Sequence, residues 1–155
     1  MSSLSSADGV EIIAFMLHEQ QFCVRTTSIR EIRGWAPVTP LPHTPPEVLG
    51  VMNLRGTVIP IVDLSMKLGM PCAHTTDRSA IVVTNVIGKT IGLMVDRVSD
   101  ILTVSISELQ PVPDAAGSAG AYADGVIARE KAMICFLSLE RIFGAQGEAD
   151  WADVA

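Results

Sequence analysis

The side chains that could carry out chemistry are three histidines and a few carboxylates, and their spacing matches no catalytic motif. His18, His43 and His74 fall in a turn, a proline-rich segment and a polar loop, without an acid or nucleophile at the spacing that acid–base or covalent catalysis requires. Asp63 precedes a short helical pattern and Asp96 follows an apolar run, and neither has a neighbouring carboxylate that would form an acid–base pair. The sequence predicts no catalytic residue.

Cysteines and glycines give no sign of a metal or cofactor. Cys23, Cys72 and Cys135 are far apart and odd in number, which fits neither a disulfide framework nor a zinc cluster. The segment Cys72-Ala73-His74 offers two ligands, whereas a structural zinc site needs four and an open one three. The glycines occur singly at turns and helix ends rather than in a phosphate-binding loop. We expect no metal and no cofactor.

The composition of the chain limits the classes of partner that it can bind. The chain has 155 residues, a net charge of -6 and 5% aromatic residues. Nucleic acid is an unfavourable partner for such a chain, because its binding depends on clustered Lys and Arg and on stacking rings. A small-barrel oligonucleotide binder, the alternative from another class, would need a basic, aromatic-lined strand face. No apolar run reaches the roughly 20 residues of a membrane span, and residues 1–9 are Ser-rich without the basic start or the apolar core of a signal peptide. We expect a cytoplasmic protein without direct membrane contact.

The elements are organised around residues 50–64, where two apolar runs flank the dipeptide Arg55-Gly56. Glycine supplies the positive φ of a two-residue turn, so the stretch predicts a β-hairpin with Arg55 at its tip. Both faces of the hairpin are largely apolar, which predicts strands wrapped by protein. Pro60 cannot donate a ladder hydrogen bond, and this predicts an edge strand or a bulge.

Short strands and capped helical turns fill the rest of the chain. Strand patterns cover 12–17, 22–24, 29–35, 81–85, 90–95, 98–104 and a hairpin over 125–137. Gly88 predicts a type II′ turn if it takes the first central position. Asp63 and Ser138 are expected to cap short helices at 64–68 and from 139 to about 144, and Ser105 or Ser107 to cap a further turn. The prolines between residues 37 and 46 exclude a helix or a central strand there.

An internal repeat predicts the architecture. A shift of about 75 residues places Gly50-Val51 on Gly125-Val126, and a shift near 69 places Ile29 on Val98. We interpret this as duplication of a five-strand unit that ends in a capped helix. The predicted fold is all-β, with two five-stranded β-barrel lobes side by side and short capping helices. The expected division is a disordered N-terminus (1–10), a first lobe (11–79), a second lobe (80–146) and a C-terminal tail (147–155), with exchange of terminal strands between lobes left open.

Three blocks of the chain resemble the CheW-like family of chemotaxis coupling proteins: 31–35 (EIRGW), 38–42 (VTPLP) and 50–64 (GVMNLRGTVIPIVDL). A further block, 92–96 (GLMVD) followed by 98–101 (VSDI), adds to the likeness. The resemblance covers about Glu11 to Gly144. It implies two SH3-like barrels and a non-catalytic adaptor that joins the histidine kinase CheA to the cytoplasmic tips of chemoreceptors in signalling arrays at the inner membrane. Control of another output by a chemotaxis-like pathway is a second interpretation.

The resemblance also implies which positions face the receptor, in a groove between the lobes: Ile29, Glu31, Gly50, Arg55, Gly92, Val98 and Ile101. Each position has a structural alternative. The two glycines can be backbone requirements, and the three aliphatic residues can be ordinary core. Glu31 and Arg55 can pair with each other, so that Arg55 supports the groove instead of contacting the partner. The kinase contact has no sharp motif, so no residue is assigned to it.

Overall fold

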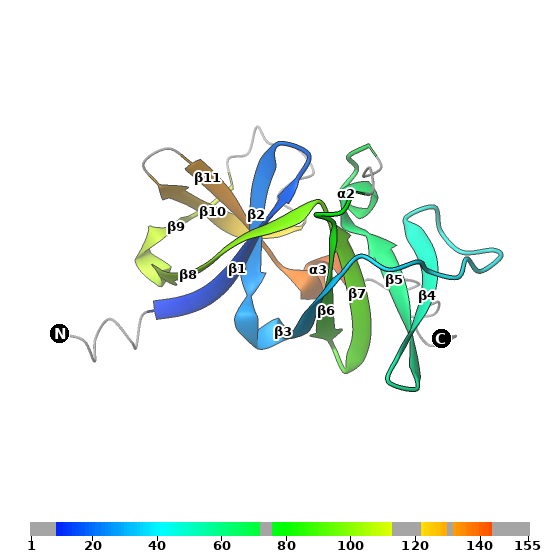
Figure 1. The fold of residues 1–155 in the computed structure, drawn as a ribbon. Coiled ribbons are helices and arrows are strands. Elements are labelled where there is room, and N and C mark those ends of the chain that lie inside the picture. Colours follow the sequence, from blue (N-terminus) through cyan, green and yellow to red (C-terminus); the bar gives the residue numbers. More distant parts are fainter. Residues whose placement is uncertain (1–8, 72–75, 113–121, 130–131, 144–155) are drawn as a thin grey trace.

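The computed structural model describes residues 9–71, 76–112, 122–129 and 132–143, and in this part of the chain two β-sheets lie side by side (Figure 1). The five-stranded sheet has the order β3-β6-β7-β5-β4, and the six-stranded sheet has the order β8-β1-β2-β11-β10-β9. The all-β prediction is confirmed. The sixth strand is β9, a two-residue addition to the edge of β10.

The elements follow the local sequence patterns. The strands are β1 (Gly9–Leu17), β2 (Gln20–Arg25), β3 (Ile29–Gly34), β4 (Val48–Leu54), β5 (Thr57–Asp63), β6 (Ala80–Val86), β7 (Lys89–Val95), β8 (Arg97–Ser105), β9 (Leu109–Gln110), β10 (Ala123–Arg129) and β11 (Ala132–Leu137). The helices are α2 (Leu64–Lys67) and α3 (Leu139–Phe143), and single 3₁₀ turns cover η1 (Thr26–Ser28) and η2 (Ile106–Glu108). The predicted strand β1 begins at Gly9, inside the stretch that the sequence assigned to a disordered N-terminus.

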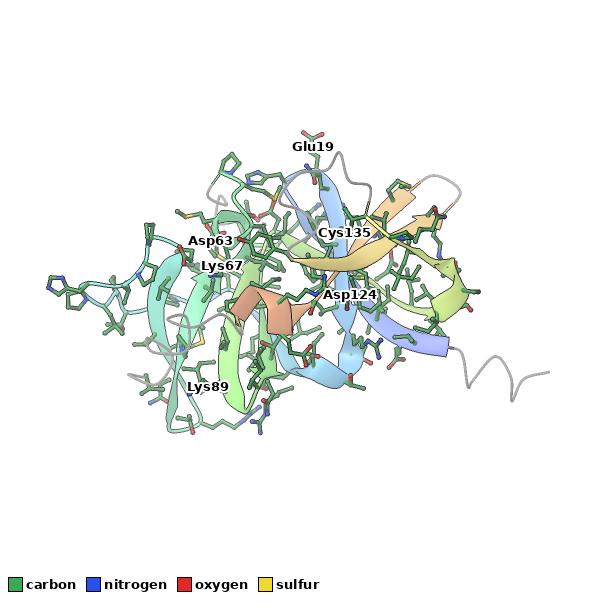
Figure 2. All side chains as sticks on the ribbon, turned by 180° about the vertical axis from the view of Figure 1, so that it is seen from behind. Glu19, Asp63, Lys67, Lys89, Asp124 and Cys135 are labelled. Carbon is green, nitrogen blue, oxygen red and sulfur yellow. The ribbon has the colours of Figure 1, made fainter. Side chains whose placement is uncertain are left out.

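The helix caps agree with prediction. The Asp63 carboxylate accepts hydrogen bonds from the backbone N–H groups of Ser65 and Met66, at 3.0 and 3.4 Å, at the start of α2 (Figure 2). The hydroxyl of Ser138, which the repeat places on Asp63, accepts a hydrogen bond from Arg141 N–H at 3.3 Å. Ser105 caps η2 in a capping box with Glu108.

Three predictions about the hairpins are wrong in detail. The turn between β6 and β7 has Ile87 and Gly88 at its centre with φ of 50° and 78°, which is type I′ geometry and not II′. β5 is an interior strand between β7 and β4. Pro60 is tolerated because the pairing of β5 with β7 begins at Ile61, so Pro60 has no place in that ladder. Val58 is 43% exposed, so one face of the hairpin is only partly covered.

Each sheet contains strands from both halves of the chain, so the sheets cross the expected boundary at residue 79. Strands β6 and β7, from the second half, join β3, β4 and β5. Strands β1 and β2, from the first half, join β8 to β11. The exchange thus involves a whole hairpin from each half. A local pattern cannot reveal it, because the exchanged hairpins pair with strands that are distant in sequence.

The register of the exchanged strands matches the repeat. β5 pairs in parallel with β7 through Ile61 and Gly92, and β11 pairs in parallel with β2 through Phe136 and Cys23. Ile61 and Phe136 differ by 75 positions, and Cys23 and Gly92 by 69, which are the two shifts of the sequence repeat. The two halves therefore make the same non-local pairing with exchanged hairpins, which supports the duplication.

One apolar core joins the sheets and a smaller one lies with each. The shared core combines Phe15, Phe22 and Val24 of the six-stranded sheet with Val82, Leu93 and residues of both helices. A second cluster around Ile127 and Phe136 belongs to the six-stranded sheet, and a third around Ile59 and Ile61 belongs to the five-stranded sheet. The sheets are therefore held by buried side chains, which fill much of the space where they meet.

Some expectations fall on residues outside the described ranges. These are the disordered start before Gly9, the Cys72-Ala73-His74 segment, the mobile loop at 114–121, the turn at 130–131, and the tail. The end of the last helix beyond Phe143 belongs to the same group.

Candidate partner-binding site

Arg55 lies at the tip of the β4–β5 hairpin, as predicted. Arg55 and Gly56 have φ of 53° and 88°, the type I′ geometry that matches strand twist. The Asn53 side-chain oxygen accepts a hydrogen bond from Gly56 N–H at 2.7 Å, which fixes the turn. The Arg55 side chain is 72% exposed. A rigid backbone therefore presents a solvent-accessible guanidinium.

Glu31 on the edge strand β3 pairs with Arg55. A nitrogen of the Arg55 guanidinium lies 2.5 Å from Glu31 Oε1, and Arg33 lies 3.8 Å from Glu31 Oε2. β3 and β4 are the two edges of the five-stranded sheet, so the ion pair requires the sheet to curl until β3 faces the hairpin. An exposed pair contributes only about 0 to 1 kcal/mol. Its main effect is to orient the arginine.

A cavity of about 360 Å³ lies between β3 and the hairpin. Glu31, Arg55 and Arg30 supply charge, and Leu54, Ile59, Thr57 and Thr90 supply the remaining wall. Arg30 donates a hydrogen bond to the Thr90 hydroxyl at 3.3 Å, which links β3 to β7. The site can hold polar and apolar groups of a partner side by side. Nothing in this arrangement resembles a nucleophile with its base.

The three aliphatic candidates have different environments. Ile29 and Val98 are half-buried and pack against the shared core. Ile101 is 62% exposed on β8, which is the edge strand of the six-stranded sheet. Ile101 is thus available to a partner, while Ile29 and Val98 serve packing and expose only part of their surface.

The two glycines are required by the backbone and by packing. Gly50 has φ of 148°, and a Cβ there would lie 2.1 Å from the carbonyl oxygen of Thr39. A Cβ on Gly92 would lie 2.6 Å from Ile61 Cδ1 in the core of the five-stranded sheet. Both glycines are buried, so they act on the packing of the five-stranded sheet and offer little surface to a partner.

The seven positions divide between two cavities, the core and the exposed Ile101, whereas a single groove between the lobes was expected. Glu31 and Arg55 line the cavity within the five-stranded sheet, and Val98 lines another where β8 leaves β7 and meets β3. The reason is the curl of the five-stranded sheet, which brings β3 against its own hairpin. Sequence reasoning did not place Arg30 and Thr90 at the site. The only available signal was their position in strands that flank it.

Comparison with known proteins decides the family. The CheW-like domain family matches residues 11–147. The chain belongs to the CheW-like family. It is 51% identical over 139 residues to the chemotaxis protein CheW of Rhizobium meliloti (strain 1021), covering 89% of this chain and 90% of that protein. It is 48% identical over 144 residues to the probable chemotaxis protein CheW of Rhizobium etli, covering 92% of each.

A solved CheW-like structure agrees in fold. The scaffolding protein TtCheW from Thermoanaerobacter tengcongensis superposes with a TM-score of 0.81 and 26% identity, over 89% of this chain and 94% of that one. The family and this structural neighbour confirm the resemblance drawn from residues 31–64 and 92–101. In the described part of the chain, no helix has the length and apolarity needed to cross a membrane.

Proposed function

We propose that this CheW-like protein is a non-catalytic adaptor that couples a CheA-type histidine kinase to the cytoplasmic tip of chemoreceptors and so controls kinase activity. The adaptor works in the cytoplasm and is recruited to receptor arrays at the inner membrane. Its partners are proteins, and it acts on neither nucleic acid nor lipid. Membership of the CheW-like family and the likeness to a scaffolding protein support this role.

The observation that carries the proposal is the exposed guanidinium of Arg55, held by Glu31 beside an open cavity. The receptor hairpin is helical, and an apolar stripe of a helix can dock against a groove while charges fix its register. The exposed Ile101 and the partly exposed Val98 extend the contact toward the six-stranded sheet, and Ile29, Gly50 and Gly92 shape it from beneath.

Replacement of Arg55 tests the role. We expect Arg55→Glu to keep the wild-type circular dichroism and to lose no more than about 1 kcal/mol of unfolding free energy in urea, because an exposed pair contributes no more than that. The variant should recover at least about tenfold less receptor fragment in co-sedimentation with kinase and receptor, since it places a like charge beside Glu31 and removes the donor. Wild-type recovery would contradict the role of Arg55.

The charge swap Glu31→Arg/Arg55→Glu separates the two roles left open for the pair. If Arg55 contacts the receptor, the double variant remains defective although the ion pair is restored. If the Glu31–Arg55 ion pair only supports the groove, the double variant regains assembly, and the direct contact is wrong.

A further inference from the structure

Three arginines from separate segments line one cavity of about 510 Å³ at the junction of the two sheets. Arg33 comes from β3, Arg78 from the segment before β6, and Arg97 from the first position of β8. We call this cavity the arginine groove. Its other lining residues are Ile32, Gly34, Asp77, Ser79, Ala80 and Val98. Arg78, Arg97 and Arg33 are all exposed.

The groove keeps an excess of positive charge. Arg33 shares Glu31 with Arg55, at 3.8 Å from Oε2. Neither Arg78 nor Arg97 has a carboxylate within ion-pair distance among the residues described here. Asp77 is the acid in the lining. The whole chain carries a net charge of -6, so this local surface has the opposite sign from the molecule.

Hydrogen bonds hold the backbone of all three segments that carry the arginines. Trp35 N–H donates to the carbonyl of Ser79 at 3.1 Å, which ties the end of β3 to the start of β6. The Thr76 hydroxyl accepts a hydrogen bond from Arg78 N–H at 3.1 Å. Asp96, next to Arg97, donates its N–H to the carbonyl of Met16 at 3.0 Å. The guanidinium groups therefore project from a preorganised frame, which lowers the cost of binding.

The lining identifies the chemistry of the ligand. Guanidinium groups pair with carboxylates through charge-assisted hydrogen bonds that are often bidentate. Ile32 is 40% exposed, and Val98 adds further apolar surface in the same groove. A ligand with carboxylates beside aliphatic groups satisfies both features, as an amphipathic protein segment does. A nucleic acid or an anionic membrane fits less well, because the surrounding surface repels a long polyanion.

We propose that the arginine groove binds an acidic amphipathic helix of a protein partner, with Arg78 and Arg97 selecting its carboxylates. The inference deepens the proposed adaptor role and rests on it for the helical form of the partner. It assigns selectivity to Arg78 and Arg97, which lie outside the seven positions that the family resemblance implies. An acidic residue beside the apolar stripe of the partner helix would then strengthen binding, whereas a lysine at the same position would weaken it.

The test uses the full chain and two labelled helical peptides of about 18 residues. One peptide carries a leucine stripe flanked by glutamates, and the other has glutamine at every glutamate. In fluorescence anisotropy, wild type should bind the glutamate peptide about tenfold more tightly, as expected for two solvent-exposed ion pairs. Arg78→Gln/Arg97→Gln should remove this preference. Arg129→Gln, at the far end of the six-stranded sheet, removes one charge and should keep it.

Three results would overturn the inference. The first is equal affinity for the two peptides. The second is a preference for the glutamate peptide that survives in Arg78→Gln/Arg97→Gln. The third is tighter binding of anionic phosphatidylglycerol vesicles or of an oligonucleotide than of the glutamate peptide. The kinase and receptor assay with Arg55→Glu is independent of these peptides. If Arg55→Glu loses receptor recovery in that assay and the peptide preference is absent, the adaptor role stands and the selectivity of the groove fails. If the peptide preference is present and Arg55→Glu assembles normally, the receptor contact fails instead.

Discussion

At the scale of single residues, some backbone positions have a φ that side chains rarely adopt. Gly50 has φ of 148° and lies against the backbone of Thr39 and Pro40. Gly69 has φ of 86° but faces open space. The two glycines thus share a positive φ and differ in crowding, which makes them a matched pair for separating backbone strain from collision.

We expect Gly50→Ala to destabilise the protein by at least about 3 kcal/mol, since a disfavoured φ costs about 1 to 3 kcal/mol and the new Cβ also meets backbone atoms that cannot move aside. Gly69→Ala should cost about 1 kcal/mol. Urea unfolding followed by circular dichroism measures both. Similar losses for the two variants would show that collision with Thr39 contributes nothing.

A second prediction at this scale concerns Cys23. Burial raises the pKa of the Cys23 thiol from 9.0 to about 12, and the nearby Cys135 adds to the shift. Because the unfolded thiol ionises at the lower pH, its contribution to stability is complete below pH 9 and is lost as pH rises toward 12. The slope is about 1.4 kcal/mol per pH unit in that window.

Comparison of wild type with Cys23→Ala isolates this thiol from other groups that titrate at high pH. We expect the unfolding free energy of wild type to fall more steeply than that of the variant between pH 9 and pH 12. Parallel curves would be inconsistent with a buried thiol at this position. The fixed cost of the cavity left by alanine shifts the variant curve without changing its slope.

At the scale of elements, the β6–β7 turn has the type I′ geometry that suits a hairpin but an isoleucine at a position of positive φ. Ile87 has φ of 50° and is 64% exposed. A β-branched residue is disfavoured at positive φ, whereas asparagine tolerates it. The sequence analysis allowed a type II′ turn with Gly88 at its first central position, whereas the structure has Ile87 at that position.

Ile87→Asn should therefore stabilise the protein by about 1 kcal/mol, with a higher midpoint in thermal unfolding. Ile101→Asn is the control, because Ile101 is 62% exposed but extended in β8. Asparagine is a poor strand residue, so this variant should lose stability. If both variants lose stability, the turn geometry is not the limiting factor at Ile87.

Hairpins and caps could be predicted from sequence because their signals are local. Arg55-Gly56 specifies a two-residue turn, and Asp63 specifies the start of α2, without reference to the rest of the chain. The interior position of β5 and the exchange of hairpins could not be predicted, since the parallel pairing of Ile61 with Gly92 joins residues from different repeats. For the site, the sequence left the Glu31–Arg55 pair open as an alternative to direct partner contact. It could not predict the curl of the sheet that brings Arg30 and Thr90 beside them.

At the scale of the whole molecule, the exchange makes the two sheets interdependent. Each sheet takes one hairpin from the other half of the chain, and β6 and β7 lie between β3 and β5 in the five-stranded order. The shared core includes Phe15 and Phe22 from the first half and Val82 and Leu93 from the second. Neither half can therefore close its own core.

We expect the fragments 1–79 and 80–155 to be unfolded in isolation, although each contains one complete sequence repeat. Fragment 1–79 would leave β3 without its neighbour β6 and β5 without β7, and it would expose the apolar side of Phe15 and Phe22 to water. Circular dichroism and amide proton dispersion should show no cooperative structure in either fragment.

The intact chain should unfold in one transition by tryptophan fluorescence and by circular dichroism. A fragment that unfolds cooperatively, or an intact chain with separate transitions, would mean that the repeats are independent and that the exchanged hairpins are not essential to the fold.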